Sequence, residues 1–280
     1  MTPTIALLTD FGTTDTYVGV MKGVIARIAP DATVIDVTHS VPPGDVANGA
    51  FQLWKAVRYF PEDAIFVIVV DPGVGTERRP IGARWQNRQL IAPDNGILSY
   101  LLAQADVEQS VELQDPRFQL ENISTTFHGR DIFAPAGAHL AAGVPLQELG
   151  PALESLKRIR LPTFQRKGEQ LQGEVVHIDQ FGNLITSIGR IRADGELLHI
   201  NPWLREDPPF VLTRGEVRAA LEDRPLLQLD ETFGDVPPGE LVAYIGSEGL
   251  LEVAVNQGSA AERLGARVGD RVHLTMQEAS

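Results

Sequence analysis

Uninterrupted apolar runs alternate with helix-spaced apolar positions in the N-terminal part of the chain. The runs at residues 4–8 and 66–70 are typical of strands buried on both faces of a parallel sheet. Helical spacing is found at 17–28 and 46–60, and a short strand is expected at 33–37. This order predicts an α/β N-terminal domain in which helices cover a mostly parallel sheet.

The composition and the spacing of apolar residues change near residue 150. Prolines and a cluster of basic residues at 151–172 indicate a linker that includes a short helix. From residue 173 to 280, short apolar stretches are separated by Gly, Pro, Asp and Asn, which predicts a smaller all-β, barrel-like C-terminal domain. The expected domains are therefore 1–150 and 173–280, joined by the linker at 151–172.

The composition narrows the classes of partner. In 280 residues, 24 Lys and Arg oppose 37 Asp and Glu, and the net charge of −13 argues against nucleic acid or an anionic membrane as the main partner. The absence of cysteine excludes disulfides, thiolate metal sites and Cys nucleophiles. No apolar run reaches the roughly 18 residues of a membrane helix, and the first residues lack a signal-peptide pattern, so we expect a cytoplasmic protein.

Two of the apolar runs end in an aspartate. Asp71 follows the run at 66–70 and precedes a Pro-Gly step that cannot continue a central strand, and Asp10 follows the first run. Because open α/β sheets bind ligands at the carboxyl ends of their strands, Asp71 and the nearby Arg78 indicate a site for polar chemistry. A simple turn with a solvent-facing ion pair explains the same residues, and the pattern does not separate the two interpretations.

The six histidines show no recognised metal-binding spacing. None forms an HxH or HExxH pattern, so a dinuclear phosphoesterase would have to combine Asp10 and Asp71 with His39 and His128. The chain also lacks the GxGxxG and GxxxxGK[ST] motifs of nucleotide-binding loops. We therefore expect neither a metal nor a nucleotide cofactor, although the four-residue metal alternative stays open.

Two turns in the C-terminal half carry amide, hydroxyl and carboxylate groups. They lie at 179–183, with the sequence DQFGN, and within 247–256, with the sequence SEGLLEVAVN. Each is explained as a simple β-turn. Each also offers groups that can hydrogen-bond to the edge of a purine, so both interpretations remain open.

Taken together, six segments of the chain resemble one family closely. It is the S-adenosyl-L-methionine (SAM) hydroxide adenosyltransferases, or SAM hydrolases, which are related to the SAM-dependent fluorinase and chlorinase. Each segment alone is weakly specific, but the six occur in the family's order between residues 5 and 261. They are LLTDFGTTDTYVGVMKGV, VDPGVGTERR, APDNGILS, TFHGRDIFAPAGAHLA, DQFGNLITSI and SEGLLEVAVNQGSAA.

The resemblance implies the conversion of SAM and water into adenosine and L-methionine, without a cofactor or metal. It implies a homotrimer whose ligand lies between the N-terminal domain of one subunit and the C-terminal domain of its neighbour. The family's catalytic residues correspond to Asp71, Arg78 and His128, and its ribose-binding carboxylate corresponds to Asp10. Its adenine and methionine contacts correspond to Asp179, Asn183, Ser247, Glu252 and Val255, the last acting mainly through its backbone.

Three departures from the fluorinase pattern favour water as the nucleophile. The fluorinase carries Tyr-Ser where this chain has His128-Gly129, lacks an arginine at the position of Arg78, and has an extra N-terminal loop that is not found here. A SAM-dependent halogenase nevertheless remains the alternative enzyme. A module that binds adenosine or SAM without turnover is the non-catalytic alternative.

Overall fold

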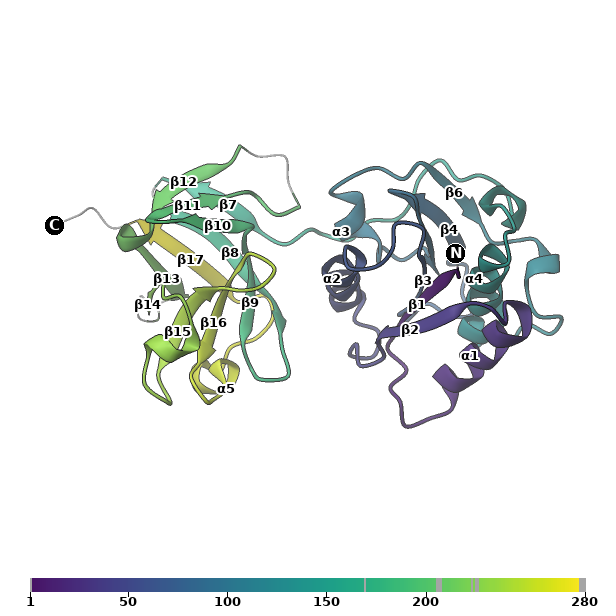
Figure 1. Ribbon diagram of the computed structural model, residues 1–280, viewed down its shortest axis with the longest axis horizontal. Helices are drawn as coiled ribbons and strands as arrows, with labels where there is room; N and C mark the ends of the chain where they lie inside the picture. Colours follow the sequence, from purple (N-terminus) through teal and green to yellow (C-terminus); the bar gives the residue numbers. More distant parts are fainter. Residues whose placement is uncertain (1, 169, 205–207, 223, 225–226, 277–280) are drawn as a thin grey trace. The chain divides into compact units, whose positions relative to one another are not determined.

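The computed structural model describes residues 2–168, 170–204, 208–222, 224 and 227–276 of the chain. It divides into two compact units, Met1–Arg160 and Leu161–Ser280 (Figure 1). Among the described residues, no helix combines the length and the apolar character needed to cross a membrane.

A six-stranded sheet forms the centre of the first unit. Its order is β2-β1-β3-β5-β4-β6, in which β2, β1, β3 and β5 are parallel and β4 is antiparallel to both of its neighbours. The sheet is thus mixed, because β4 and β5 form an antiparallel hairpin after β3. The strands are β1 (Thr4–Thr9), β2 (Thr33–Thr38), β3 (Ile65–Val69), β4 (Pro80–Trp85), β5 (Arg88–Pro93) and β6 (Gln109–Glu112).

Helices cover both faces of this sheet, which explains why β3 is buried along its whole length. On one face, α1 and α4 contribute to a core with alternate residues of β1 and β3. On the other, α2 approaches so closely that Gly49 lies against Val70 and Ile97. The helices are α1 (Tyr17–Ile28), α2 (Val46–Val57), α3 (Ser99–Leu102) and α4 (Ala134–Ala141), and a π-helical turn, Gly129–Phe133, leads into α4.

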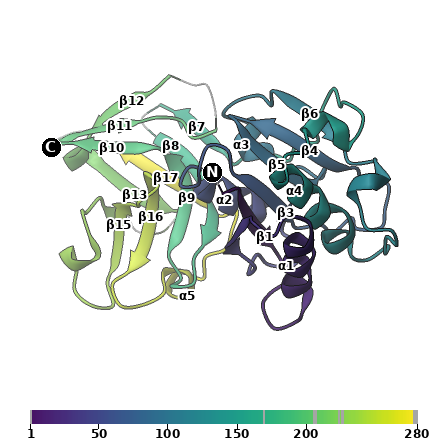
Figure 2. The same ribbon diagram turned by 45° about the vertical axis from the view of Figure 1, so that its right-hand side comes forward.

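The second unit contains a barrel-like antiparallel sheet with the path β14-β13-β17-β8-β9-β16-β15 and with β7 beside β8. A bridge between Leu229 and Ala243 brings the two ends of this path together, so the sheet nearly closes. α5 (Ala260–Leu264) lies at one end, beside β9 and β16 (Figures 1 and 2). The strands are β7 (Phe164–Lys167), β8 (Gln170–Ile178), β9 (Leu184–Gly189), β13 (Val217–Leu221), β14 (Leu227–Gln228), β15 (Leu241–Ile245), β16 (Leu250–Val255) and β17 (Arg271–Met276).

A smaller antiparallel sheet completes the second unit. It has the order β10-β11-β12, formed by β10 (Ile191–Asp194), β11 (Leu197–Ile200) and β12 (Phe210–Thr213). Its inward-facing residues, including Leu198 and Ile200, join the apolar core of the barrel-like sheet. The sequence pattern did not single out these three strands.

The segment 151–172 differs from the expected linker with a short helix. Its described residues contain no helix, and the boundary between the units falls after Arg160. The first half stays with the first unit, since the Leu153 amide donates to the Ser110 carbonyl at 2.9 Å. The second half forms β7 and the start of β8, because Phe164 is buried in the barrel core while the following basic residues face outward.

Candidate active site

Asp71 follows the carboxyl end of β3, a strand of the first sheet that is buried along its whole length. After β3 and the buried Val70, the chain turns at once, and the Val74 amide donates to the Asp71 carbonyl at 3.2 Å. The turn keeps the Asp71 side chain only 4% exposed. A carboxylate this buried needs a charged partner, because an unpaired buried charge is strongly unfavourable.

Arg78 supplies that partner and also contacts His128. Its Nε lies 2.9 Å from each carboxylate oxygen of Asp71, and its Nη2 donates to Asp71 Oδ2. The same Nη2 lies 2.9 Å from His128 Nδ1. The guanidinium also lies over the ring of Phe133, with its Cζ 5.1 Å from the ring centroid.

The contact with Arg78 fixes the state of His128. Arginine has only donors, so His128 Nδ1 accepts, and the ring proton of the neutral imidazole lies on Nε2. Burial, and next the charge of Arg78, lower the pKa of His128, while Asp71 opposes the shift. The hydrogen bond and the electrostatics therefore both favour a neutral His128.

A buried carboxylate holds the segment that leads to His128. Asp131 is fully buried, and it accepts hydrogen bonds from Arg130 Nε at 2.5 Å and from the Ser124 amide at 2.8 Å. Ser124 lies four residues before His128, and Asp131 lies in the π-helical turn. The Asp131 side chain therefore links the start of the segment before His128 to that turn. Asp131 was not among the predicted site residues, although it lies inside the FHGRD segment.

Asp10 occupies the neighbouring strand end. It follows β1, and its Oδ2 accepts a hydrogen bond from the Gly44 amide at 2.8 Å. Partial burial raises the pKa of Asp10, the bond from Gly44 opposes the shift, and the charge of Asp71 adds to it. The parallel pairing of β1 with β3 thus brings Asp10 and Asp71 to one edge of the sheet, as the strand pattern predicted.

A cavity of about 300 Å³ opens between these groups. Asp10, Asp71 and His128 line it, and Arg78 lies behind the lining, bonded to Asp71 and His128. Three aromatic rings add an apolar wall, with centroids 5.2 to 5.9 Å apart; they belong to Phe11, Tyr17 and Phe127. The structure therefore brings together all four residues that were predicted on the N-terminal half.

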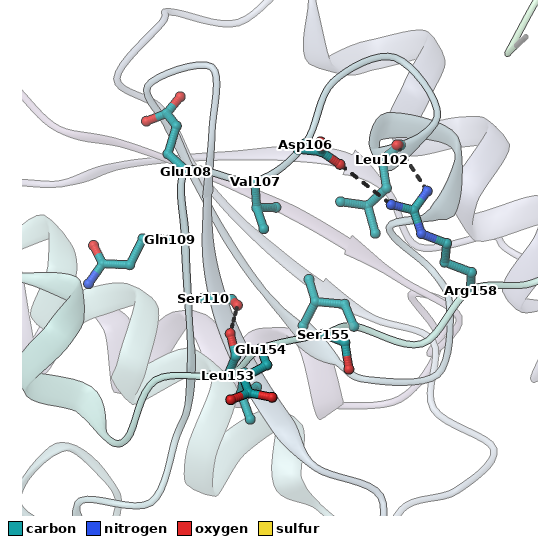
Figure 3. A pocket seen from close by; sticks show the side chains of 11 residues that line it. Leu102, Asp106, Val107, Glu108, Gln109, Ser110, Leu153, Glu154, Ser155 and Arg158 are labelled. Atoms are coloured by element: carbon teal, nitrogen blue, oxygen red, sulfur yellow. Dashed lines mark hydrogen bonds and ion pairs between the residues drawn. The ribbon is translucent and has the colours of Figure 1, made fainter.

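A second cavity of about 360 Å³ lies beside β6, on another part of the first unit (Figure 3). Arg158 lies at one side of it, with Nη1 3.0 Å from the Leu102 carbonyl and Nη2 3.7 Å from Asp106. Ser110 Oγ donates to the Leu153 carbonyl at 3.0 Å. None of the predicted site residues lines this second cavity. The candidate active site is therefore the smaller cavity, beside Asp10, Asp71 and His128.

The predicted residues of the C-terminal half lie in the second unit. In the turn between β8 and β9, Asn183 donates through its amide and its Nδ2 to the two carboxylate oxygens of Asp179, both at 2.9 Å. Ser247 lies in the β15–β16 hairpin turn, and the buried Val255 ends β16. Glu252 on β16 accepts a 2.5 Å hydrogen bond from the Tyr244 hydroxyl.

Tyr244 is a residue that the sequence analysis missed. Burial raises its pKa, and the hydrogen bond to Glu252 and the charge of Asp179 add to the shift. The phenol is therefore protonated and donates to the carboxylate. The pairing of the two hairpin strands could have revealed this residue, because Tyr244 lies directly opposite Glu252 across β15 and β16.

The four residues of the metal alternative do not form a set of metal ligands, although three of them line the same cavity. The Asp71 carboxylate is bound by Arg78, while His39 contacts Thr9 Oγ1 at 2.8 Å and Asp36 Oδ1 at 3.0 Å. In the part of the chain that the structure describes, no three His, Asp or Glu side chains gather as metal ligands.

Models of known protein families match both parts of the chain that contain the predicted site residues. Models of the SAM hydroxide adenosyltransferase N-terminal and C-terminal domains match residues 5–150 and 173–273. The chain belongs to the SAM hydroxide adenosyltransferase family.

Within this family, the chain is similar over its whole length to proteins named (R)-S-adenosyl-L-methionine hydrolase. The one from Salinispora arenicola is 44% identical, covering 98% of each chain, and the one from Thermus thermophilus is 40% identical, covering 96% and 98%. A fluorinase from an Actinoplanes species is 31% identical, covering 98% and 97%. A crystal structure of an uncharacterized conserved protein from Thermotoga maritima is 36% identical, with a TM-score of 0.85 and coverage of 97% and 99%.

Proposed function

We propose that this protein hydrolyses SAM to adenosine and L-methionine, by in-line attack of water on the ribose C5′. The observation that carries the proposal is the Asp71–Arg78–His128 hydrogen-bonded group beside the cavity that also contains Asp10. Relatives at 40–44% identity are named for this reaction, and their names specify the (R) epimer. We therefore propose (R)-SAM as the substrate.

The reaction makes three demands on the site. Methionine leaves as a neutral thioether, so the leaving group needs no general acid. Water, with a pKa of about 15.7, is a poor nucleophile and must be held in line with the C5′–S bond. Its proton must leave as the C–O bond forms, and the charge that develops on oxygen must be stabilised.

The residues around the cavity fit these demands. Arg78 carries a permanent positive charge, and its buried Nη1 has no hydrogen-bond partner among the described residues, which supports a role in stabilising a hydroxide-like oxygen. Neutral His128 can orient the water through its Nε2 proton. Within this group the Asp71 carboxylate takes up the proton that the water releases and passes it to solvent, because Arg78 has only donors and His128 Nδ1 already accepts from Arg78.

Asp10 fits the ribose. An ionised carboxylate can accept two hydrogen bonds, and the bond from Gly44 to Oδ2 leaves Oδ1 for the 2′- and 3′-hydroxyls. We propose further that the protein is a metal-independent homotrimer that needs no cofactor. In it, a neighbouring copy would supply the adenine and methionine contacts Asp179, Asn183, Ser247, Glu252 and Val255, as the family resemblance implies.

Product analysis in ¹⁸O-labelled water tests the reaction. We expect (R)-SAM to give adenosine with the label in its 5′-hydroxyl, together with unlabelled methionine, because water attacks C5′. Formation of 5′-chloro-5′-deoxyadenosine in the presence of chloride would instead support a halogenase. Persistence of intact SAM beside tightly bound adenosine would support a binding module.

Substitutions of Arg78 and His128 test whether the residues beside the cavity catalyse this reaction. Arg78→Ala and His128→Ala should each reduce kcat by roughly 100-fold or more, because each removes a group that stabilises the attacking oxygen. Arg117→Ala is the matched control, since Arg117 forms an exposed ion pair with Asp115. Correctly folded Arg78 and His128 variants with wild-type turnover would contradict the assignment.

A further inference from the structure

The loop after β2 encloses the turn that carries Asp10. The parallel register of β1 and β2 shifts between Leu7 and Leu8, so that Leu7 pairs with Asp36 but Leu8 pairs with Thr38. This irregularity advances β2 by one residue relative to β1. His39 consequently lies beside Thr9, the last residue of β1.

His39 contacts both sides of Asp10. Its side chain is buried, and its Nδ1 lies 2.8 Å from Oγ1 of the fully buried Thr9. The same Thr9 oxygen accepts from the Phe11 amide at 3.3 Å, and the His39 carbonyl accepts from the Gly12 amide at 2.8 Å. His39 therefore contacts the side chain of Thr9, directly before Asp10, and the backbone amide of Gly12, two residues after it.

A surface ion pair orients the imidazole from its other side. His39 Nε2 lies 3.0 Å from Asp36 Oδ1, and Asp36 Oδ2 accepts from Lys22 Nζ at 2.7 Å. A carboxylate next to Nε2 favours a proton on that nitrogen, which leaves Nδ1 to accept from the Thr9 hydroxyl. The geometry of the Asp36 contact does not make it a hydrogen bond, so Asp36 acts on Nε2 through its charge, while Nδ1 is bonded to Thr9.

The same loop ends on Asp10 itself. Five residues after His39, the Gly44 amide donates to Asp10 Oδ2 at 2.8 Å. The beginning of the loop thus fixes the backbone around Asp10, and its end fixes one carboxylate oxygen. Because the Gly44 amide holds Oδ2, a rotation of this carboxylate would break that bond and redirect Oδ1.

We propose that His39 and Thr9 are positioning residues, which hold Asp10 in the orientation that binds the ribose of SAM. This inference rests on the proposed function, in which Asp10 binds the ribose hydroxyls. It predicts that the two residues act on substrate affinity through Asp10 rather than on the chemical step.

Paired variants of Thr9 test the proposal. Thr9→Val keeps the shape of the side chain but removes the hydroxyl, and Thr9→Ser keeps the hydroxyl. We expect Thr9→Val and His39→Ala to raise the Kd for adenosine and the KM for SAM by about 10-fold, with a much smaller change in kcat. Thr9→Ser should stay close to wild type, as should Ser110→Ala, which removes a buried hydroxyl from β6.

A double-mutant cycle separates positioning from a general structural role. If Thr9 acts through Asp10, Thr9→Val should not weaken adenosine binding further in an Asp10→Ala background. An equal loss in both backgrounds would overturn the inference, as would unchanged affinity in folded Thr9→Val and His39→Ala proteins. If either variant fails to fold, Asp36→Asn takes its place, because Asp36 is partly exposed, and it should also raise the Kd for adenosine.

Calorimetry with adenosine keeps this test separate from the test of the reaction. Wild-type protein that binds adenosine but does not consume SAM contradicts the hydrolysis, yet the binding comparison still decides the role of His39. Wild-type protein that binds no adenosine contradicts the ribose role of Asp10 and overturns this inference with it.

Discussion

The imidazole of His128 shows how two neighbours set the state of a single group. Burial and the Arg78 charge favour its neutral form, and the Nδ1 contact with Arg78 requires an unprotonated Nδ1. In the unfolded chain, the same side chain would titrate near 6.5. The folded protein therefore binds fewer protons at this position than the unfolded chain does.

We expect His128 to titrate below 6.5 in the folded protein, and Arg78→Gln to raise its pKa, because the substitution removes a positive charge next to the ring. Its contribution to stability should be present above pH 6.5 and should be lost as the pH falls through the lower folded pKa. NMR titration of the histidine ring signals measures the shift. His139 is the internal control, since burial alone lowers its pKa and Arg78→Gln should leave it unchanged. A pKa of His128 that falls in Arg78→Gln would contradict this account.

At the scale of elements, the loop after β3 packs against the segment that leads to His128. Gly75 has a φ of +76°, and a Cβ at this position would clash with the Thr125 carbonyl. The two loops that carry Asp71 and His128 thus approach each other where only glycine fits.

Gly75→Ala should therefore lower both thermal stability and turnover. A left-handed backbone costs a non-glycine residue about 1–2 kcal/mol, and the displacement of Thr125 adds to this at the approach to His128. Gly143→Ala is the matched control, because Gly143 has a φ of +91° but a Cβ at this position would meet open space. Thermal melts and SAM turnover measure both variants, and equal losses in the two would show that the contact with Thr125 is unimportant.

The strands that carry the chemistry were also those most readily predicted. β1 and β3 are uninterrupted apolar runs that end at an aspartate, since strands buried on both faces have no polar alternation. The strands β10–β12 have four residues each and are partly exposed, and β10 also contains charged residues, so none of them forms a long apolar run. The contact between Thr9 and His39 could not be predicted, because it depends on a register shift between strands 30 residues apart in sequence.

At the scale of the whole molecule, the two groups of predicted site residues belong to different units. Asp71, Arg78 and His128 lie in the first, and the Asp179–Asn183 turn lies in the second. The proposed trimer assigns the two groups around one substrate to different copies of the chain. A variant damaged in one unit should then complement a variant damaged in the other.

Mixing of His128→Ala with Asn183→Ala tests this assignment. Each variant alone should be almost inactive. After subunit exchange at equal concentrations, three quarters of the trimers would contain one site with both wild-type halves, so about a quarter of wild-type turnover should return. Sites built within single chains would regain none, because every chain carries one damaged half. Native mass spectrometry confirms that mixed trimers form, and their inactivity, or a monomeric wild type, would refute the shared site.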